Sequence, residues 1–293
     1  MLAKKRITAL LCLALIIFTA VPTALADDTG EARVTIGADL TAAQIARVYA
    51  DFGLKQGDVD ELVVTNAEER SYLEGLVPEK KIGTVALSCL YIQIMPVGSG
   101  LDIVLKNINY CTPDMYKNAL ETAGIYDARV MVTAPYPVSG TGALTGAYKA
   151  YEDITGQSLN ALAKAVGAEE LVLTGELAEY VGSAEAAAII SELKTMLDKT
   201  AGMTDEEVRA EIAAIAKLYN VSLTNAQINQ ILSLVRKLEG LDEEALQKRL
   251  TSMAKTAQTA GKAAETISRV YESVKNFFAA VGGFFSRIFA RGK

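Results

Sequence analysis

The fold is decided by residues 84–134, TVALSCLYIQIMPVGSGLDIVLKNINYCTPDMYKNALETAGIYDARVMVTA. Two apolar runs, 84–95 and 101–110, flank the glycine-containing turn PVGSG, a pattern that is typical of a β-hairpin. Thr112 followed by Pro113 is typical of a helix N-terminus, so we expect a helix from there to about residue 123. Residues 128–134 are the most apolar strand candidate. One hairpin and one helical crossover together predict a mixed sheet.

Upstream of this stretch, helical and strand signals alternate. A helix is expected from about residue 41, because its apolar residues share one face, and Gly53 ends it. Residues 61–64 are a short strand candidate. A second helix, 67–76, follows the capping residue Asn66 and stops at a proline. With a further helix over 141–154, these elements predict an α+β domain that spans residues 32–182.

Beyond residue 183 the strand signals disappear and the composition becomes rich in Ala, Leu, Glu and Lys. Three helices are expected, over 184–200, 205–219 and 225–239. Thr204 and Thr224 each precede a Glu or Gln by three residues, which is the signature of a capping box at a helix N-terminus. Because the apolar residues lie on one side of each helix, residues 184–240 should form a small all-α bundle.

The last segment, 241–293, follows a heptad pattern and predicts a long amphipathic helix. If the helix is unbroken it is on the order of 70 Å long. Its seam could pair with a partner helix or with a second copy of the chain, giving a homo-oligomer. The thirteen seam positions are Leu246, Leu250, Met253, Ala257, Ala260, Ala264, Ile267, Tyr271, Val274, Phe278, Val281, Phe285 and Ile288.

The apolar stripe of this segment widens after residue 270, and its polar face becomes basic. Four basic residues and no acidic residue lie between 273 and 293. Such a helix is suited to an anionic membrane surface, whereas packing against its own chain is the alternative. The expected membrane or partner face consists of Val270, Val274, Phe277, Phe278, Val281, Phe284, Phe285 and Ile288.

The N-terminus has the pattern of a secretory signal peptide. A basic start is followed by an apolar run that ends in Ala24-Leu25-Ala26, so residues 1–26 are expected to be removed. An uncleaved membrane anchor is the alternative. Cleavage removes three of the 29 basic residues and none of the 35 acidic ones, which leaves a net charge of −9. We therefore expect an extracytoplasmic protein, secreted or peripheral on the outer face of the cytoplasmic membrane, with no affinity for nucleic acid.

The composition excludes several kinds of chemistry. The 293 residues include no histidine and no tryptophan, so imidazole-based triads and His-ligated metal sites are ruled out. We predict neither a bound metal nor a cofactor. Paired carboxylates stay available for an extracytoplasmic hydrolase, and Glu68, Glu69 and Glu74 on one helix are its candidates.

A glycine-rich loop, Gly140 to Gly146, follows a predicted strand and opens a predicted helix. Backbone N–H groups in such a loop can bind an anion, so Gly140, Thr141, Gly142 and Gly146 are candidate ligand-binding residues. The loop has one residue too many for the dinucleotide fingerprint and lacks the lysine of a P-loop. A turn that needs glycine for close helix–sheet packing explains the same residues.

Two cysteines remain after export, Cys89 and Cys111. In the expected hairpin Cys89 lies opposite Asn107, four residues from Cys111. This offset is about 13 Å along a strand, beyond the roughly 7 Å that separates bridged Cα atoms. A disulfide would need a bulge or a shifted register, and two buried thiols are the alternative.

Four segments of this chain resemble a known family. They are GADL at 37–40, VTNAEERSYLEGLVPEKKIGT at 64–84, NINYCTPDMYKNALETAGI at 107–125 and APYPVSGTGALTGAYKAYED at 134–153. In their order along the chain and in their amino-acid sequence they are similar to the YpuA-like exported proteins of Gram-positive bacteria, the domain of unknown function 1002. The resemblance implies an extracytoplasmic protein without an assigned activity, cofactor or catalytic residue.

These observations lead us to expect a non-enzymatic binding or scaffold protein of the cell envelope. Its C-terminal helix would hold it at an anionic membrane surface or on a partner helix. The alternatives are a hydrolase that uses carboxylates and a small-ligand binder that uses the loop at 140–146.

Overall fold

A computed structural model describes residues 30–74 and 82–241 of the chain. The signal peptide predicted for residues 1–26 and the long helix predicted for residues 241–293 lie outside these ranges, apart from residue 241 itself. Within them, no helix combines the length and the apolar character that crossing a membrane requires.

The centre of the α+β part is a five-stranded mixed sheet with the order β2-β1-β3-β5-β4. Strand β3 is antiparallel to both of its neighbours, and the other adjacent pairs, β1 with β2 and β4 with β5, are parallel. The α+β class and the mixed sheet are as predicted. The strands are β1 (Ala32–Gly37), β2 (Asp60–Val64), β3 (Cys89–Ile94), β4 (Leu101–Leu105) and β5 (Ala128–Thr133).

The predicted hairpin between the third and fourth strands is wrong, because β5 lies between β3 and β4 and pairs with both. The turn after β3 passes around the first residue of β5 instead of closing on itself. The side chain of Asp127 holds it there, since Oδ1 accepts hydrogen bonds from the backbone N–H groups of Gly98 and Gly100. The most apolar strand is thereby paired on both edges, while β4, whose residues alternate in exposure, forms an edge.

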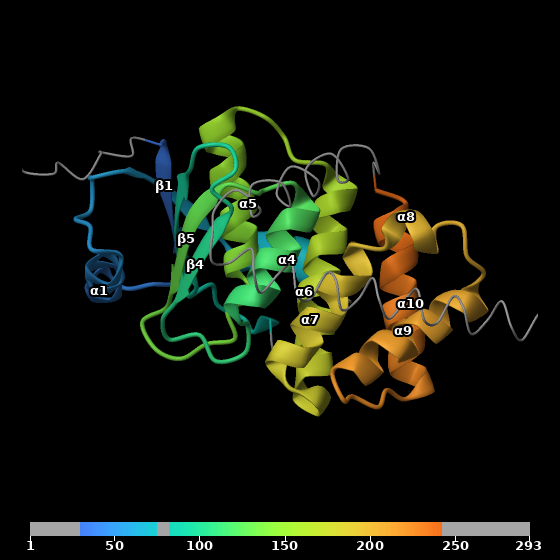
Figure 1. Cartoon of the computed structure of the whole chain (residues 1–293). Coiled ribbons are helices and arrows are strands. Elements are labelled where there is room, and N and C mark those ends of the chain that lie inside the picture. Colours follow the sequence, from blue (N-terminus) through green and yellow to red (C-terminus); the bar gives the residue numbers. More distant parts are fainter. Residues whose placement is uncertain (1–29, 75–81, 242–293) are drawn as a thin grey trace, which may run out of the picture.

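Helix α1 (Ala42–Phe52) covers one face of the sheet. The strand β1 that precedes it is not among the elements predicted from the sequence. Val48, Tyr49 and Phe52 of α1 pack on Val34 and Ile36 of β1. The capping box at Thr41 and the left-handed Gly53 set the two ends of this helix. Figure 1 shows α1 on the side of the sheet that faces away from the other labelled helices.

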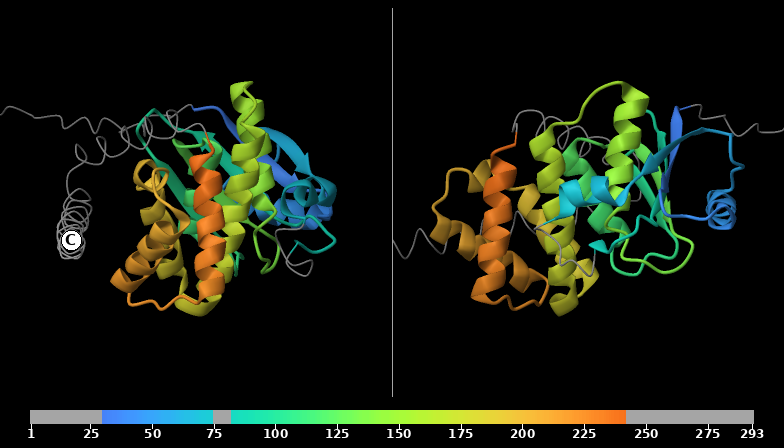
Figure 2. Two further views of the ribbon diagram at one scale, coloured as in Figure 1. Left: turned by 90° about the vertical axis from the view of Figure 1, so that its right-hand side faces the viewer. Right: turned by 180° about the vertical axis from the view of Figure 1, so that it is seen from behind.

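In the part of the chain that the structure describes, the opposite face is covered by helices α2 (Asn66–Leu73), α4 (Pro113–Ala123) and α5 (Ala143–Thr155). Strand side chains alternate between the two faces, as the period of two requires. Leu90, Ile92 and Val130 therefore enter the main core beneath α4 and α5. In the rear view of Figure 2, α2 lies between α5 and the next helix, α6.

Helix α6 (Ala161–Val181) is shared by two cores. Ala168, Leu171 and Val172 belong to the core beneath the sheet, whereas Leu173 and Leu177 belong to the core of the helical bundle. The bundle continues the stack of layers away from the sheet (Figure 1). Its other helices are α7 (Ser183–Lys194), α8 (Leu197–Thr200), α9 (Asp205–Leu218) and α10 (Asn225–Glu239), and the two predicted capping boxes are present.

A buried polar network joins α4, α6 and α7. The Lys194 ammonium donates a hydrogen bond to the carbonyl of Asn118 and lies 3.1 Å from Oε1 of Glu170. Thr122 donates to the other oxygen of Glu170. Because Lys194 and Glu170 are 3% and 0% exposed, each charge depends on the other for its stability in the interior.

Neither cysteine forms a disulfide, and both are buried. Cys89 packs in the core beneath α1, and Cys111 packs in the core on the other face of the sheet. The two thiols are thus separated by the sheet itself. This agrees with the alternative of two buried thiols, although the hairpin argument against a bridge does not apply.

Candidate functional site

A pocket of about 520 Å³ lies at the carboxyl ends of the parallel strands. The loop after β5 supplies Thr141 and Gly142, and the segment after β4 supplies Asn109 and Tyr110. The pocket lies where the segments after β4 and β5 meet helix α2 and the segment that precedes β3. The remaining described lining residues are Glu69, Ile82, Gly83, Val85, Leu87, Ser88, Pro137, Val138 and Ser139.

Glu69 is the most unusual of these residues, because this carboxyl-bearing residue is 3% exposed. The capping box at Thr65 starts α2 and thereby places Glu69 on the turn of the helix that faces the pocket. Its Oε2 accepts one long hydrogen bond, 3.3 Å from Nδ2 of Asn66. Burial raises the pKa of Glu69 to about 7, and the nearby charges of Asp39 and Glu68 act in the same direction, while the bond from Asn66 opposes them.

Gly142 is needed where the loop meets Glu69. A Cβ atom at this position would lie 2.1 Å from Oε1 of Glu69, so a larger residue could not approach the carboxyl group as closely. The residues before it are held by backbone bonds to the segment after β4, including those from Asn109 N to Val138 O and from Cys111 N to Ser139 O. The loop is therefore a fixed wall of the pocket.

Hydroxyl groups line the same wall. The Ser139 and Thr141 hydroxyls are 3.2 Å apart, and the phenol of Tyr116 donates a hydrogen bond to the carbonyl of Gly140 beneath them. Tyr110 reaches past the pocket, and its hydroxyl donates to the carbonyl of Val172 on α6 at 3.3 Å. The pocket thus combines one carboxyl group and several hydroxyls with an apolar side formed by Val85, Leu87 and Val138.

The structure separates the predicted site residues. Gly140, Thr141 and Gly142 lie at or beside the pocket, whereas Gly146 lies one turn into α5 and packs against Thr35 of β1. Both the ligand-binding and the packing interpretations of this loop are therefore compatible with its geometry.

The three candidate carboxylates also diverge. Glu68 caps α2 at Thr65 and forms an ion pair with Lys149 at 2.6 Å, so it is already engaged. Although partial burial opposes the shift, the hydrogen bonds from Lys149 and Thr65 lower the pKa of Glu68. Glu74 is exposed at the end of the helix. Only Glu69 of the three lines the pocket.

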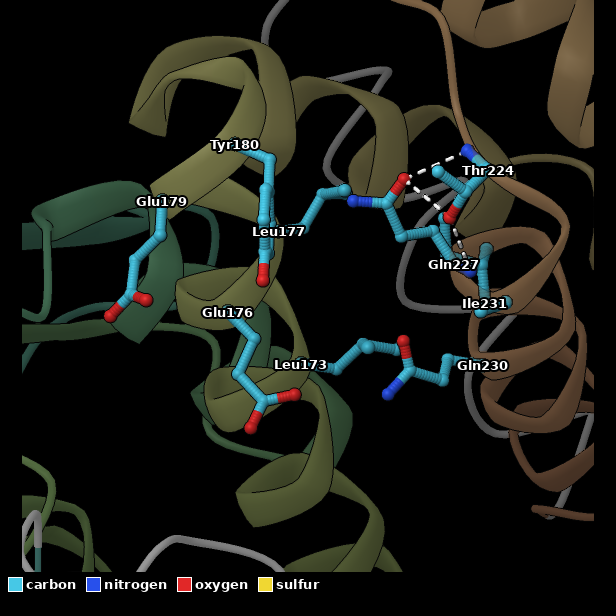
Figure 3. Close-up of a pocket in the computed structure, with 10 residues that line it drawn as sticks. Leu173, Glu176, Leu177, Glu179, Tyr180, Thr224, Gln227, Gln230 and Ile231 are labelled. Atoms are coloured by element: carbon cyan, nitrogen blue, oxygen red, sulfur yellow. Dashed lines mark hydrogen bonds between the residues drawn. The ribbon is translucent and has the colours of Figure 1, made fainter.

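A second pocket, of about 440 Å³, lies between α6 and α10. Figure 3 shows Leu173, Leu177 and Tyr180 of α6 facing Gln227 and Ile231 of α10. Thr224 and Gln227 are already bonded to each other in the capping box at the start of α10. Tyr180, at its edge, is 77% exposed. The described lining of this groove holds no buried charged group, so it offers less chemistry than the first pocket.

Sequence reasoning did not identify Asn109, Tyr110, Ser139 or the residues that precede β3 as parts of one site. They come from three separate segments, which are brought together because β5 enters between β3 and β4. The available signal was the polar character of the residues that follow β4 and β5, since ligands bind at the carboxyl ends of such strands.

The fold and the site define an α+β protein with a small pocket at the ends of its parallel strands. The profile of the family described as "Protein of unknown function (DUF1002)" matches residues 36–255, and the chain belongs to this family. A Bacillus subtilis (strain 168) protein, described as uncharacterized protein YpuA, is 38% identical over 242 residues, which is 82% of this chain and 83% of the relative. No solved structure matches the chain significantly.

Proposed function

We propose that this protein is a non-enzymatic binding protein of the cell envelope, and that the pocket beside Glu69 and Gly142 holds a small polar ligand. The observation that carries the proposal is the convergence of a buried carboxyl group with a fixed glycine loop in a cavity of about 520 Å³. Such a cavity, partly apolar and with a few converging polar groups, is typical of small-molecule sites.

A binding role is better supported than hydrolysis by paired carboxylates. Glycoside hydrolysis needs a second carboxyl group at a defined distance across the cleft from the first. Among the described lining residues of this pocket, Glu69 is the one carboxylic acid. Asp39 acts on the Glu69 carboxyl through its charge, but its own Oδ2 accepts a hydrogen bond of 2.7 Å from the backbone of Ala86.

The binding proposal can be tested by screening small molecules against the isotopically labelled protein by NMR. The panel contains methyl glycosides, polyols, short amines and phosphate. We expect hits that shift the amide signals of residues 139–142, and we expect Asn109→Trp to abolish them, because Asn109 is an exposed residue on the rim. Tyr136→Trp, which alters an exposed residue of the same loop outside the lining, should leave them unchanged. A panel without any hit at 139–142 would refute the proposal.

We further propose that the protein is exported and that residues 270–293 hold it at an anionic membrane surface. Support comes from the N-terminal pattern and from the Phe-rich, basic character of that segment, both of which lie outside the described residues. Burying apolar side chains gains roughly 1.5–3 kcal/mol each before ordering costs. The basic residues add about 1 kcal/mol each, a contribution that salt screens.

Sedimentation with vesicles tests this part. The mature chain should co-sediment with anionic vesicles at low salt and less with neutral vesicles, and Phe278→Glu with Phe285→Glu should abolish the effect. Lys237→Glu with Arg209→Glu alters charges on the bundle instead and serves as the control. If the Phe variant sediments as the wild type does, residues 270–293 do not bind the membrane.

A further inference from the structure

We infer that the ligand of the pocket beside Glu69 is a small primary ammonium ion with a short hydrocarbon body. This inference rests on the proposed binding function and specifies the chemical class of the ligand. Its basis is the arrangement of charge, hydrogen-bond acceptors and apolar surface around the Glu69 carboxyl group.

Among the described lining residues of the cavity, Glu69 is the one charged side chain, so the charge of this lining is negative. No lysine or arginine is among its described lining residues. Lys149 pairs with Glu68, and the Arg70 guanidinium, which donates to the carbonyl of the lining residue Gly83 at 2.9 Å, is a positive group at the edge of the cavity. Asp39 and Glu68 both act on Glu69 as like charges. Beside the carboxyl group, ionised Glu69 and the charge of Asp39 attract a cation and repel a phosphate or carboxylate ligand.

The carboxyl group itself has room for a further hydrogen-bond donor. Its one hydrogen bond among the described residues is the long one from Asn66 to Oε2, and Oε1 lies over the Cα atom of Gly142. An ionised carboxylate that is 3% exposed needs a counter-charge or more hydrogen bonds to be stable. A bound ammonium would supply both.

The rest of the lining matches the rest of such a ligand. An ammonium group has three N–H donors. One would bond to Glu69, and the other two would find acceptors in the hydroxyl oxygens of Ser139 and Thr141 on the adjoining wall. Val85, Leu87 and Val138 provide apolar contact for a few methylene groups. The cavity volume of about 520 Å³ admits a molecule of this size.

Between pH 5 and 8, Glu69 is the group at the pocket whose charge is expected to change, because its described neighbours on other elements keep their charge states. Tyr116 on α4 and Cys89 on β3 stay neutral, because burial raises the pKa of each, that of Cys89 to about 12. Glu68 stays ionised beside Lys149. Asp39, from the turn after β1, contributes a further negative charge. Ammonium binding should therefore strengthen as the pH rises through 7, because ionised Glu69 is the form that pairs with a cation.

Three isosteric probes test the inference: n-butylammonium, 1-butanol and butyrate, each titrated into the mature protein and followed by NMR. We expect n-butylammonium to bind at least tenfold more tightly than the other two. Its affinity should rise at least threefold between pH 5.5 and 8, and the Glu69 carboxyl signal should show a lowered pKa in the complex.

Glu69→Gln should weaken the binding of n-butylammonium at least tenfold and leave the binding of 1-butanol unchanged. Glu74→Gln, on the exposed end of the same helix, is the matched control.

The outcomes separate this inference from the proposed function. If 1-butanol or a neutral polyol binds at residues 139–142 as tightly as n-butylammonium, the pocket is a ligand site and the ammonium inference is wrong. If no probe and no member of the earlier panel shifts these residues, the proposed function fails as well. The pH titration of the unaltered protein keeps the inference testable even if Glu69→Gln folds poorly.

Discussion

Glu69 makes the stability of the protein depend on pH. Its pKa rises from an ordinary 4.5 to about 7 in the folded chain, mainly because of burial. The folded state therefore binds this proton more tightly than the unfolded state does. The resulting stabilisation is complete below pH 4.5 and is lost as the pH rises through 7, a difference of about 3 kcal/mol.

Glu69→Gln should remove that dependence, because an amide stays neutral throughout. Urea unfolding at pH 4.5 and pH 8 measures it: the variant should lose about 3 kcal/mol less than the wild type between the two conditions. Glu74→Gln, at an exposed position, should behave as the wild type does. Equal losses for Glu69→Gln and the wild type would show that the carboxyl group is not held in a desolvated state.

At the scale of elements, the approach of α5 to the sheet depends on Gly146. A Cβ atom there would lie 2.4 Å from Oγ1 of Thr35 on β1. Gly146→Ala should therefore destabilise the fold by about 1–3 kcal/mol, as overpacking of a core does. Gly202→Ala is the control, since the nearest atom to its Cβ would be a carbonyl oxygen 3.9 Å away.

A double-mutant cycle separates the overlap with Thr35 from a general effect of the substitution. Thr35→Ala removes the overlapping oxygen, so the combination with Gly146→Ala should be more stable than the sum of the single changes predicts. Thermal or chemical unfolding of the four proteins gives the coupling. Strict additivity would mean that α5 does not rest on Thr35.

The elements that the sequence predicted best have local signals. The capping boxes at Thr204 and Thr224, the Thr112-Pro113 helix start and the Gly53 stop are set by residues within one helical turn, and all are present. Strand pairing is not local. A glycine-rich turn between two strands is compatible both with a hairpin and with a turn around a third strand, and Asp127, 27 residues after Gly100, decides between them.

The candidate site was predictable only in part for the same reason. Thr141 and Gly142 follow an evident strand, and Glu69 was a candidate acid on its own helix. Their contact depends on the order of strands in the sheet and on the approach of α2 to the loop after β5. No spacing in the sequence places Glu69 beside a residue more than seventy positions later.

At the scale of the whole molecule, helix α6 belongs to both cores, so the predicted domain boundary near Gly182 does not separate two independent cores. The sequence predicts a complete α+β domain before this residue. A fragment of residues 30–182 would, however, expose Leu173 and Leu177 and would leave Glu170 without the ammonium of Lys194. Loss of one partner from a buried ion pair typically costs about 3–5 kcal/mol.

We therefore expect the fragment 30–182 to lack a cooperative thermal transition, whereas 30–241 should show one. The test is near-ultraviolet circular dichroism of the tyrosines during heating. Glu170→Gln in the short fragment removes the uncompensated charge and should recover part of the structure. If only missing apolar contacts destabilise the fragment, this substitution should have no effect. A sharp transition of 30–182 at the temperature found for 30–241 would show that the two parts fold independently.

The position of β5 between β3 and β4 also constrains the order in which the chain can assemble. A chain that emerges from its N-terminus presents β3 and β4 before β5 has appeared, and during that interval their facing edges are unsatisfied. A hairpin between β3 and β4 is incompatible with the native sheet, because β5 occupies the position between them. In the folded protein, Asp127 holds the turn after β3 wide by accepting hydrogen bonds from Gly98 and Gly100. The wide turn between β3 and β4 is therefore complete only when the residue that precedes β5 is in place.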